Sequence, residues 1–100
     1  MLTHIVLWNY KESAEGGTRT ENMARVRDLL LSLPAKIPEI RRFEVHADVG
    51  IDPSAASMCL VSEFEDADAL ARYAVHPEHK AVSAFIGKVR EGRSVIDYVV

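Results

Sequence analysis

The residues of this chain that are best suited to acid/base chemistry lie in one short stretch, from Tyr73 to His79. An imidazole with a pKa near about 6.5 can accept and return a proton at neutral pH, and a phenol with a pKa near about 10 can donate a hydrogen bond to a developing oxyanion. Such a pair suits proton abstraction beside a carbonyl group. A plainer interpretation is also open, in which Tyr73 packs in the core and His79 hydrogen-bonds to backbone near a helix start.

Pro77 decides whether the tyrosine and the histidine can meet. In one straight helix, six residues at about 100° each would turn Tyr73 and His79 to different faces. A proline disfavours helical backbone at the preceding residue, His76, but suits the first position of a new helix. We therefore expect a break at Pro77 that lets both side chains converge on one space between the helices and a sheet.

Further residues are candidates for the walls of that space. His79 shares a helical stripe with Val82 and Ile86, which predicts that its ring points toward the sheet. His76 is a candidate at the helix boundary, where a capping or surface position is the simpler expectation. The first strand would supply a floor from His4, Val6 and Trp8.

A metal site is a weaker interpretation of the same stretch. His76, Glu78 and His79 are all possible ligands, but a dedicated site needs three or four ligands with suitable geometry, and Pro77 disturbs the helical spacing. We therefore predict no metal ion. We also predict no other cofactor, because no glycine-rich phosphate loop is present.

The strands that must position these residues follow from hydrophobic periodicity. Runs rich in β-branched and aromatic residues, bounded by turn-forming residues, predict strands over 3–10, 40–49, 57–65 and 94–100. The polar segment 11–18 is expected to be a loop.

The helices are marked by their ends. Thr18 to Glu21 has the form of a capping box, and the apolar stripe that follows ends at Pro34. Asp66 is a plausible cap for a second helix that ends near His76, and Pro77 opens a third. The order is β-α-β-β-α-β with the second helix divided in two, which predicts a ferredoxin-like α+β fold with a four-stranded antiparallel sheet.

Composition limits the function classes. One hundred residues fit a single domain over 1–100, and a net charge of -3 without a basic stripe argues against nucleic acid as a partner. Cys59 is the only cysteine, so no internal disulfide can form. The N-terminus lacks the pattern of a signal peptide and no apolar run reaches membrane-spanning length, so we expect a cytoplasmic protein without a membrane partner.

The first strand is apolar on both faces, with Ile5 and Leu7 on one and Val6 and Trp8 on the other. Helices can cover only one side of the sheet. The other side would then be a large apolar patch, which soluble monomers avoid. We predict a homodimer in which two sheets pack face to face.

Three segments resemble one known family. They are the opening from His4 to Lys11, the entry Phe64-Glu65-Asp66 to the second helix and, above all, the stretch from Tyr73 to Lys80 with its H-P-x-H element. Together they resemble the stress-responsive dimeric α/β-barrel domain, Dabb, over nearly the whole chain. The resemblance implies a ferredoxin-like fold that pairs through its sheets into a dimeric α/β barrel.

The family includes polyketide cyclases similar to olivetolic acid cyclase, which close a linear polyketide by a cofactor-free aldol condensation. By motif, this resemblance implies catalytic roles for Tyr73 and His79 and pocket positions at His4, Val6 and Trp8. Trp8 is larger than an aliphatic residue, which predicts a smaller pocket.

The sequence thus predicts a dimeric protein that binds a small, partly apolar carbonyl compound. If it is an enzyme, His79 acts as general base and Tyr73 as its orienting or oxyanion partner. One alternative is a stress-related binding or structural protein in which the same pocket only holds a ligand. Another is a cofactor-free monooxygenase, since those enzymes resemble this fold in dimer form.

Overall fold

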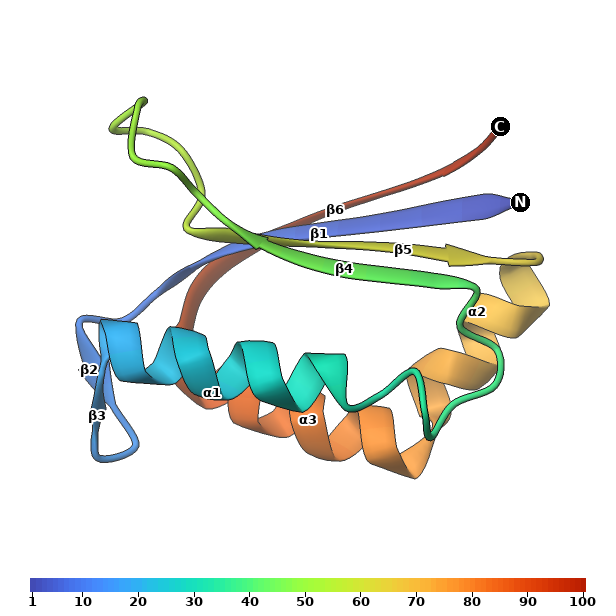
Figure 1. Cartoon of the computed structure of the whole chain (residues 1–100), viewed down its shortest axis with the longest axis horizontal. Helices are drawn as coiled ribbons and strands as arrows, with labels where there is room; N and C mark the ends of the chain where they lie inside the picture. The colour runs from blue at the N-terminus through green and yellow to red at the C-terminus, as the bar shows by residue number, and fades with distance from the viewer.

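The computed structural model describes residues 1–100 and consists of one four-stranded sheet with three helices on one of its faces (Figure 1). The long elements are β1 (Leu2–Tyr10), α1 (Arg19–Leu31), β4 (Arg42–Ala47), β5 (Met58–Phe64), α2 (Ala67–Val75), α3 (Pro77–Val89) and β6 (Arg90–Val99). The strand order is β4-β5-β1-β6, and every neighbouring pair is antiparallel. The predicted ferredoxin-like α+β fold is confirmed.

The segment predicted as a loop over 11–18 contains a small hairpin. Its strands are β2 (Ser13–Ala14) and β3 (Gly17–Thr18), joined through Glu15 and Gly16, which both have positive φ angles. Two such residues in a row match the tight turns that join antiparallel strands. Thr18 then closes the predicted capping box, because its hydroxyl accepts from the Glu21 amide at 3.2 Å and its own amide donates to the Glu21 carboxylate at 2.9 Å.

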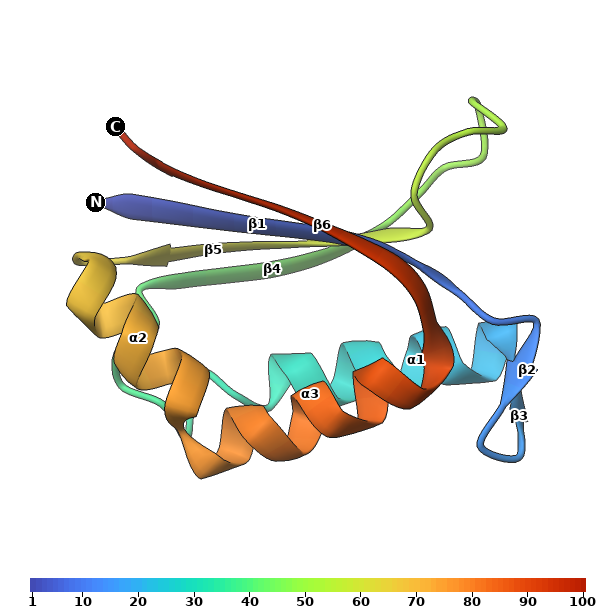
Figure 2. The same cartoon turned by 180° about the vertical axis from the view of Figure 1, so that it is seen from behind.

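The last strand begins four residues earlier than the sequence indicates. Helix α3 ends at Val89, and β6 starts directly at Arg90 without an intervening loop, as the view from behind shows (Figure 2). Pairing with β1 therefore runs from Tyr10 opposite Arg90 to Leu2 opposite Val99. The prediction of a strand from 94 is wrong at this end because sheet pairing continues through the polar residues before it.

The β1–β6 pair contains a bulge that matters for the pocket. Leu7 lies opposite Ser94 and Asn9 opposite Glu91, so Trp8 alone faces both Gly92 and Arg93. Gly92 has a φ of 65°, a conformation that glycine adopts without strain. Strand residues three apart normally point to opposite faces, but the extra residue returns Arg90 and Arg93 to the same face.

The core lies between the sheet and the helices. Val6, Trp8 and Tyr10 point from β1 toward the helices. This identifies which of the two apolar faces of the first strand lies in the core. Val26, Leu30 and Leu33 cover them from α1 and the turn after it. Leu29, also on α1, is 37% exposed, whereas Asn22 is fully buried and donates to the Ala14 carbonyl at 2.9 Å.

The opposite face of the sheet has no cover within one chain (Figures 1 and 2). Ile96 is 56% exposed and Tyr98 42% exposed, and they pair with Ile5 and Thr3 on β1. The uncovered apolar patch that the sequence predicts is therefore present. None of the helices has the length and apolar character needed to cross a membrane.

Candidate functional site

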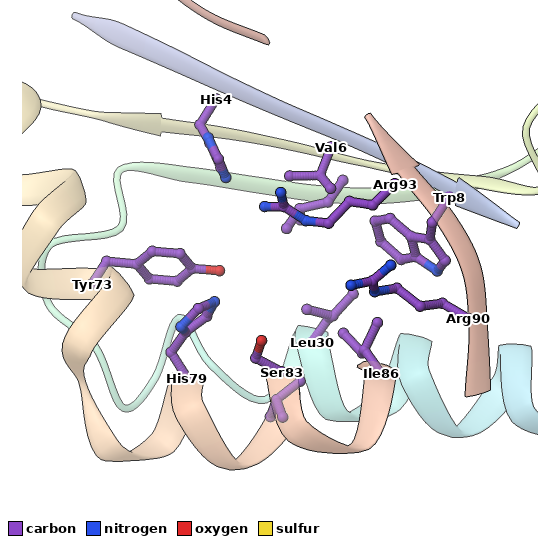
Figure 3. A pocket seen from close by; sticks show the side chains of 12 residues that line it. His4, Val6, Trp8, Leu30, Tyr73, His79, Ser83, Ile86, Arg90 and Arg93 are labelled. Carbon is purple, nitrogen blue, oxygen red and sulfur yellow. The ribbon is translucent and has the colours of Figure 1, made fainter. Parts of the chain in front are cut away.

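A pocket of about 120 Å³ lies between the helix-facing side of the sheet and helices α1 and α3, with Tyr73 of α2 at one end (Figure 3). It is lined by His4, Val6, Trp8, Leu30, Leu60, Tyr73, His79, Val82, Ser83, Ile86, Arg90 and Arg93. The structure thus brings together every pocket residue expected from the sequence except His76. The strand-one floor and the α3 stripe face each other across this space.

His76 ends α2 and caps α3 instead of lining the pocket. Its backbone is extended, with φ -63° and ψ 133°, so the helix breaks where Pro77 requires it. Its Nδ1 accepts a hydrogen bond from the Glu78 amide at 3.1 Å, which satisfies one free donor of the new helix. His76 is therefore a helix cap and is not among the residues that line this pocket.

The break at Pro77 brings Tyr73 and His79 into contact. Their ring centroids are 4.3 Å apart with the planes inclined by 45°. The Nδ1 of His79 lies 3.0 Å from the Ala74 carbonyl, and a carbonyl can only accept, so Nδ1 carries the proton. Nε2 is then an acceptor, and Figure 3 shows the imidazole edge and the Tyr73 hydroxyl both directed into the pocket.

Burial shifts the pKa of both groups. Burial lowers the pKa of His79, the Ala74 carbonyl opposes this, and positive charge from His4, Arg93 and His76 lowers it further. Burial raises the pKa of Tyr73 well above 10, with a smaller opposing effect of Arg93. Near neutral pH the imidazole is therefore unprotonated at Nε2, and the phenol keeps its proton.

His4 closes the pocket at the sheet. Its ring makes an edge contact with Phe64, with centroids 6.5 Å apart, and its Nδ1 hydrogen-bonds to the Asp97 carboxylate, which lies directly opposite on β6. Its side chain is 12% exposed, so the Asp97 partner holds a largely buried imidazole in one orientation. No group of three or more histidine, cysteine or acidic side chains is placed to hold a metal ion.

Two functional candidates in the pocket were missed by sequence reasoning. Arg90 and Arg93 reach into it from β6 (Figure 3). Their spacing of three residues does not predict that they share a face, because alternation along a regular strand would place one of them on the outer face. The only signal that could have revealed them is Gly92, since an isolated glycine inside a strand pattern suggests a bulge.

Comparisons with known proteins agree with this fold. The family model described as the stress responsive A/B barrel domain, Dabb, matches residues 2–100. A dimeric protein of unknown function with a ferredoxin-like fold from Bacteroides fragilis is 32% identical, with a TM-score of 0.83 over 97% of this chain and 93% of that one. A dimeric ferredoxin-like protein from Thermobifida fusca is 24% identical, with a TM-score of 0.86 over 99% and 90%.

Two structures named for an activity share the fold at lower identity. A hydroxynitrile lyase from Passiflora edulis is 16% identical, with a TM-score of 0.85 over 99% of this chain and 92% of that one. An antibiotic biosynthesis monooxygenase is 17% identical, with a TM-score of 0.72 over 100% and 98%. No curated protein matches the chain. The match over 2–100, together with the relative from Bacteroides fragilis, shows that this chain belongs to the Dabb family of stress-responsive A/B barrel domains.

Proposed function

We propose that this protein is a cofactor-free acid/base enzyme that acts on a small carbonyl compound. The observation that supports it is the paired placement of Tyr73 and His79, with ring centroids 4.3 Å apart, at the end of an otherwise largely apolar pocket. A hydrogen bond to the Ala74 carbonyl fixes which imidazole nitrogen is free to accept a proton. Perturbed pKa values of neighbouring groups in a pocket are typical of functional sites.

The proposed chemistry begins with proton abstraction from the carbon beside a carbonyl. Nε2 of His79 takes the proton, the electron pair of the C–H bond moves toward the carbonyl oxygen, and an enolate forms. The Tyr73 hydroxyl donates a hydrogen bond to the enolate oxygen as its negative charge develops. The imidazolium returns the proton to the product, so acid and base are both restored in each cycle.

The enolate can then be reprotonated or can attack a second carbonyl carbon in an aldol addition, as in polyketide cyclization. The pocket of about 120 Å³ restricts the substrate. A cavity of about 150 Å³ holds one benzene molecule, so the part of the substrate enclosed in this smaller pocket is no larger than benzene. A longer chain would have to extend out of the pocket.

The test is hydrogen–deuterium exchange of the α-protons of butanone, followed by NMR in heavy water near neutral pH. We expect His79→Ala to lower the enzymatic exchange rate by about 10²- to 10⁴-fold, the usual contribution of a positioned general base. Added imidazole should restore part of the rate. Lys80→Ala, an exposed neighbour on the same helix, is the matched control and should leave the rate unchanged.

Three results would contradict the proposal. Equal exchange by the wild type and His79→Ala would remove His79 from the chemistry. Saturable binding of butanone without exchange above the buffer rate would support a protein that only holds its ligand. Oxygen consumption with a quinol substrate, without α-proton exchange, would support a cofactor-free monooxygenase.

We also propose that two copies pair through the uncovered sheet face. The residues that carry this proposal are apolar and exposed in one chain, notably Ile96 and Tyr98, and soluble monomers rarely leave such a patch uncovered. The relatives from Bacteroides fragilis and Thermobifida fusca are both described as dimeric. Light scattering at micromolar concentration tests the pairing, and a clean monomer would count against it.

A further inference from the structure

We infer that the substrate of this pocket carries a carboxylate, held by Arg90 and Arg93 on the wall that β6 supplies, across from Tyr73 and His79. This inference rests on the proposed function, since it places the carbonyl group of the same substrate at His79. Figure 3 shows the Arg90 guanidinium near Trp8, and the Arg93 guanidinium beside Val6, reaching toward Tyr73. The pocket therefore has a cationic wall that faces the proposed acid/base pair.

Neither arginine has a carboxylate partner within the protein. The ion pairs of the structure involve Arg41, Arg42 and Arg72 among the arginines, and none reaches Arg90 or Arg93. Arg90 donates only to the Gly92 carbonyl at 3.1 Å, a bond within its own bulge. Asp97, the acidic residue nearest to them along the inward face of β6, is occupied by His4. Two cations on one wall without an anion leave their charge for a ligand to compensate.

The chemistry of the walls indicates a carboxylate on a short carbon chain. A guanidinium group presents planar donors that match the two oxygens of a carboxylate. Between Arg90 and His79 the walls are mainly aliphatic, from Val6, Leu60 and Ile86, which suits a few methylene groups. The Ser83 hydroxyl, an uncharged polar group, lies beside His79 (Figure 3). With a pocket of about 120 Å³, the substrate class is a small oxo acid whose carbonyl and carboxylate are separated by a short linker.

Arg93 connects the cationic wall electrostatically with the proposed acid/base pair. The charge of Arg93 lowers the pKa of both His79 and Tyr73. A carboxylate bound to Arg93 would compensate that charge, so the His79 pKa should be higher in the complex with an oxo acid than in the free protein. The direction of this change in the His79 pKa is a second measurement that does not depend on affinity.

Levulinate is a suitable probe, with methyl levulinate as the matched neutral compound that has the same ketone. Trp8 is the only tryptophan and lines the pocket, so its fluorescence reports binding to the full chain. We expect levulinate to bind about 10- to 100-fold more tightly than its methyl ester at equal ionic strength, the usual range for charge-assisted hydrogen bonds. Arg93→Gln should remove most of this preference without changing the affinity for the ester.

The controls separate this inference from a failure of folding. Arg27→Gln, on the exposed side of α1, removes an equal charge away from the pocket and should keep the preference. Arg90→Gln is the second variant, in case Arg93→Gln does not fold. Equal binding of levulinate and its ester, or an equal loss in Arg27→Gln, would overturn the inference. Competition by inorganic phosphate as strong as by levulinate would overturn the carboxylate assignment.

The two proposals fail differently. Levulinate binding that depends on Arg93, without exchange of the levulinate α-protons, would retain the anion site and overturn the acid/base enzyme. Exchange of butanone that depends on His79, without any preference for levulinate, would retain the enzyme and overturn the anion site.

Discussion

Replacing Tyr73 with phenylalanine removes one oxygen atom from the pocket and keeps the ring. Tyr73 is 2% exposed, and its ring packs against Phe64 and Phe43 with centroids 4.9 and 6.2 Å away. Phenylalanine preserves all of these contacts. The hydroxyl itself points into the pocket and is not bound to any protein group, so its loss leaves no partner unsatisfied (Figure 3).

These observations predict that loss of the Tyr73 hydroxyl has a small effect on stability and a large effect on the exchange rate. The free energy of unfolding should change by no more than about 0.5 kcal/mol, because no hydrogen bond and no packing contact is lost. The rate of α-proton exchange should fall by about 10²- to 10³-fold, the equivalent of about 3–4 kcal/mol, because a donor to the developing oxyanion is removed. A residue that serves only the core would show the opposite pattern.

Both quantities can be measured on one preparation, by urea denaturation and by NMR exchange of butanone. Tyr98→Phe, which removes a hydroxyl from the outer face of the sheet, is the matched control and should retain the exchange rate. A Tyr73→Phe variant with full exchange activity and a loss of more than about 1 kcal/mol in unfolding free energy would refute the reasoning. Tyr73 would then be a core residue whose hydroxyl has a structural role.

Three further predictions concern the pH dependence of exchange, the pH dependence of stability, and assembly. Because the pKa of His79 is lowered, the exchange rate should fall only when the pH drops below about 6.5 and passes through that lowered pKa. As the pH rises from neutral, the rate should stay constant until Tyr73 ionises above about pH 10. The unfolded chain binds the His79 proton more readily than the folded chain, so stability should also fall as the pH drops from about 6.5, and urea denaturation of His79→Ala should show a smaller fall. Ile96→Lys places a charge on the uncovered sheet face, at a residue that is 56% exposed in one chain. Light scattering should shift toward the mass of the monomer without loss of the fold. An unchanged dimer would mean that the interface is on another surface.

Most of the fold follows from local signals in the sequence. The capping box at Thr18 forms as its sequence predicts, and the helix break at Pro77 lies where proline geometry requires it. The contact between Tyr73 and His79 follows from that break, because a single straight helix would separate them by direction. Local stereochemistry was sufficient for these features because each depends on residues only a few positions apart.

The placement of Arg90 and Arg93 in the pocket depends on pairing between strands that are distant in the sequence. Trp8 faces both Gly92 and Arg93 only because β1 and β6 pair in one particular register. Periodicity within 94–100 carries no information about that register. The sequence left two positions open for His76, since a residue before a proline can either line a pocket or cap the next helix. The bond from the Glu78 amide to its ring shows that it is the cap.

The candidate site therefore depends on two interruptions of regular structure, one in each layer. Pro77 breaks the helical layer and turns His79 toward Tyr73, and the bulge at Gly92 breaks the regular alternation of the sheet and turns Arg90 and Arg93 to one side. A Cβ atom at Gly92 would meet no atom within 4 Å, so space does not require glycine there. The φ of 65° does, because L-residues with a side chain rarely adopt it. Without the bulge one arginine would leave the pocket, and without the helix break so would His79. Both interruptions are therefore needed for the proposed acid/base pair and the two arginines to face one another.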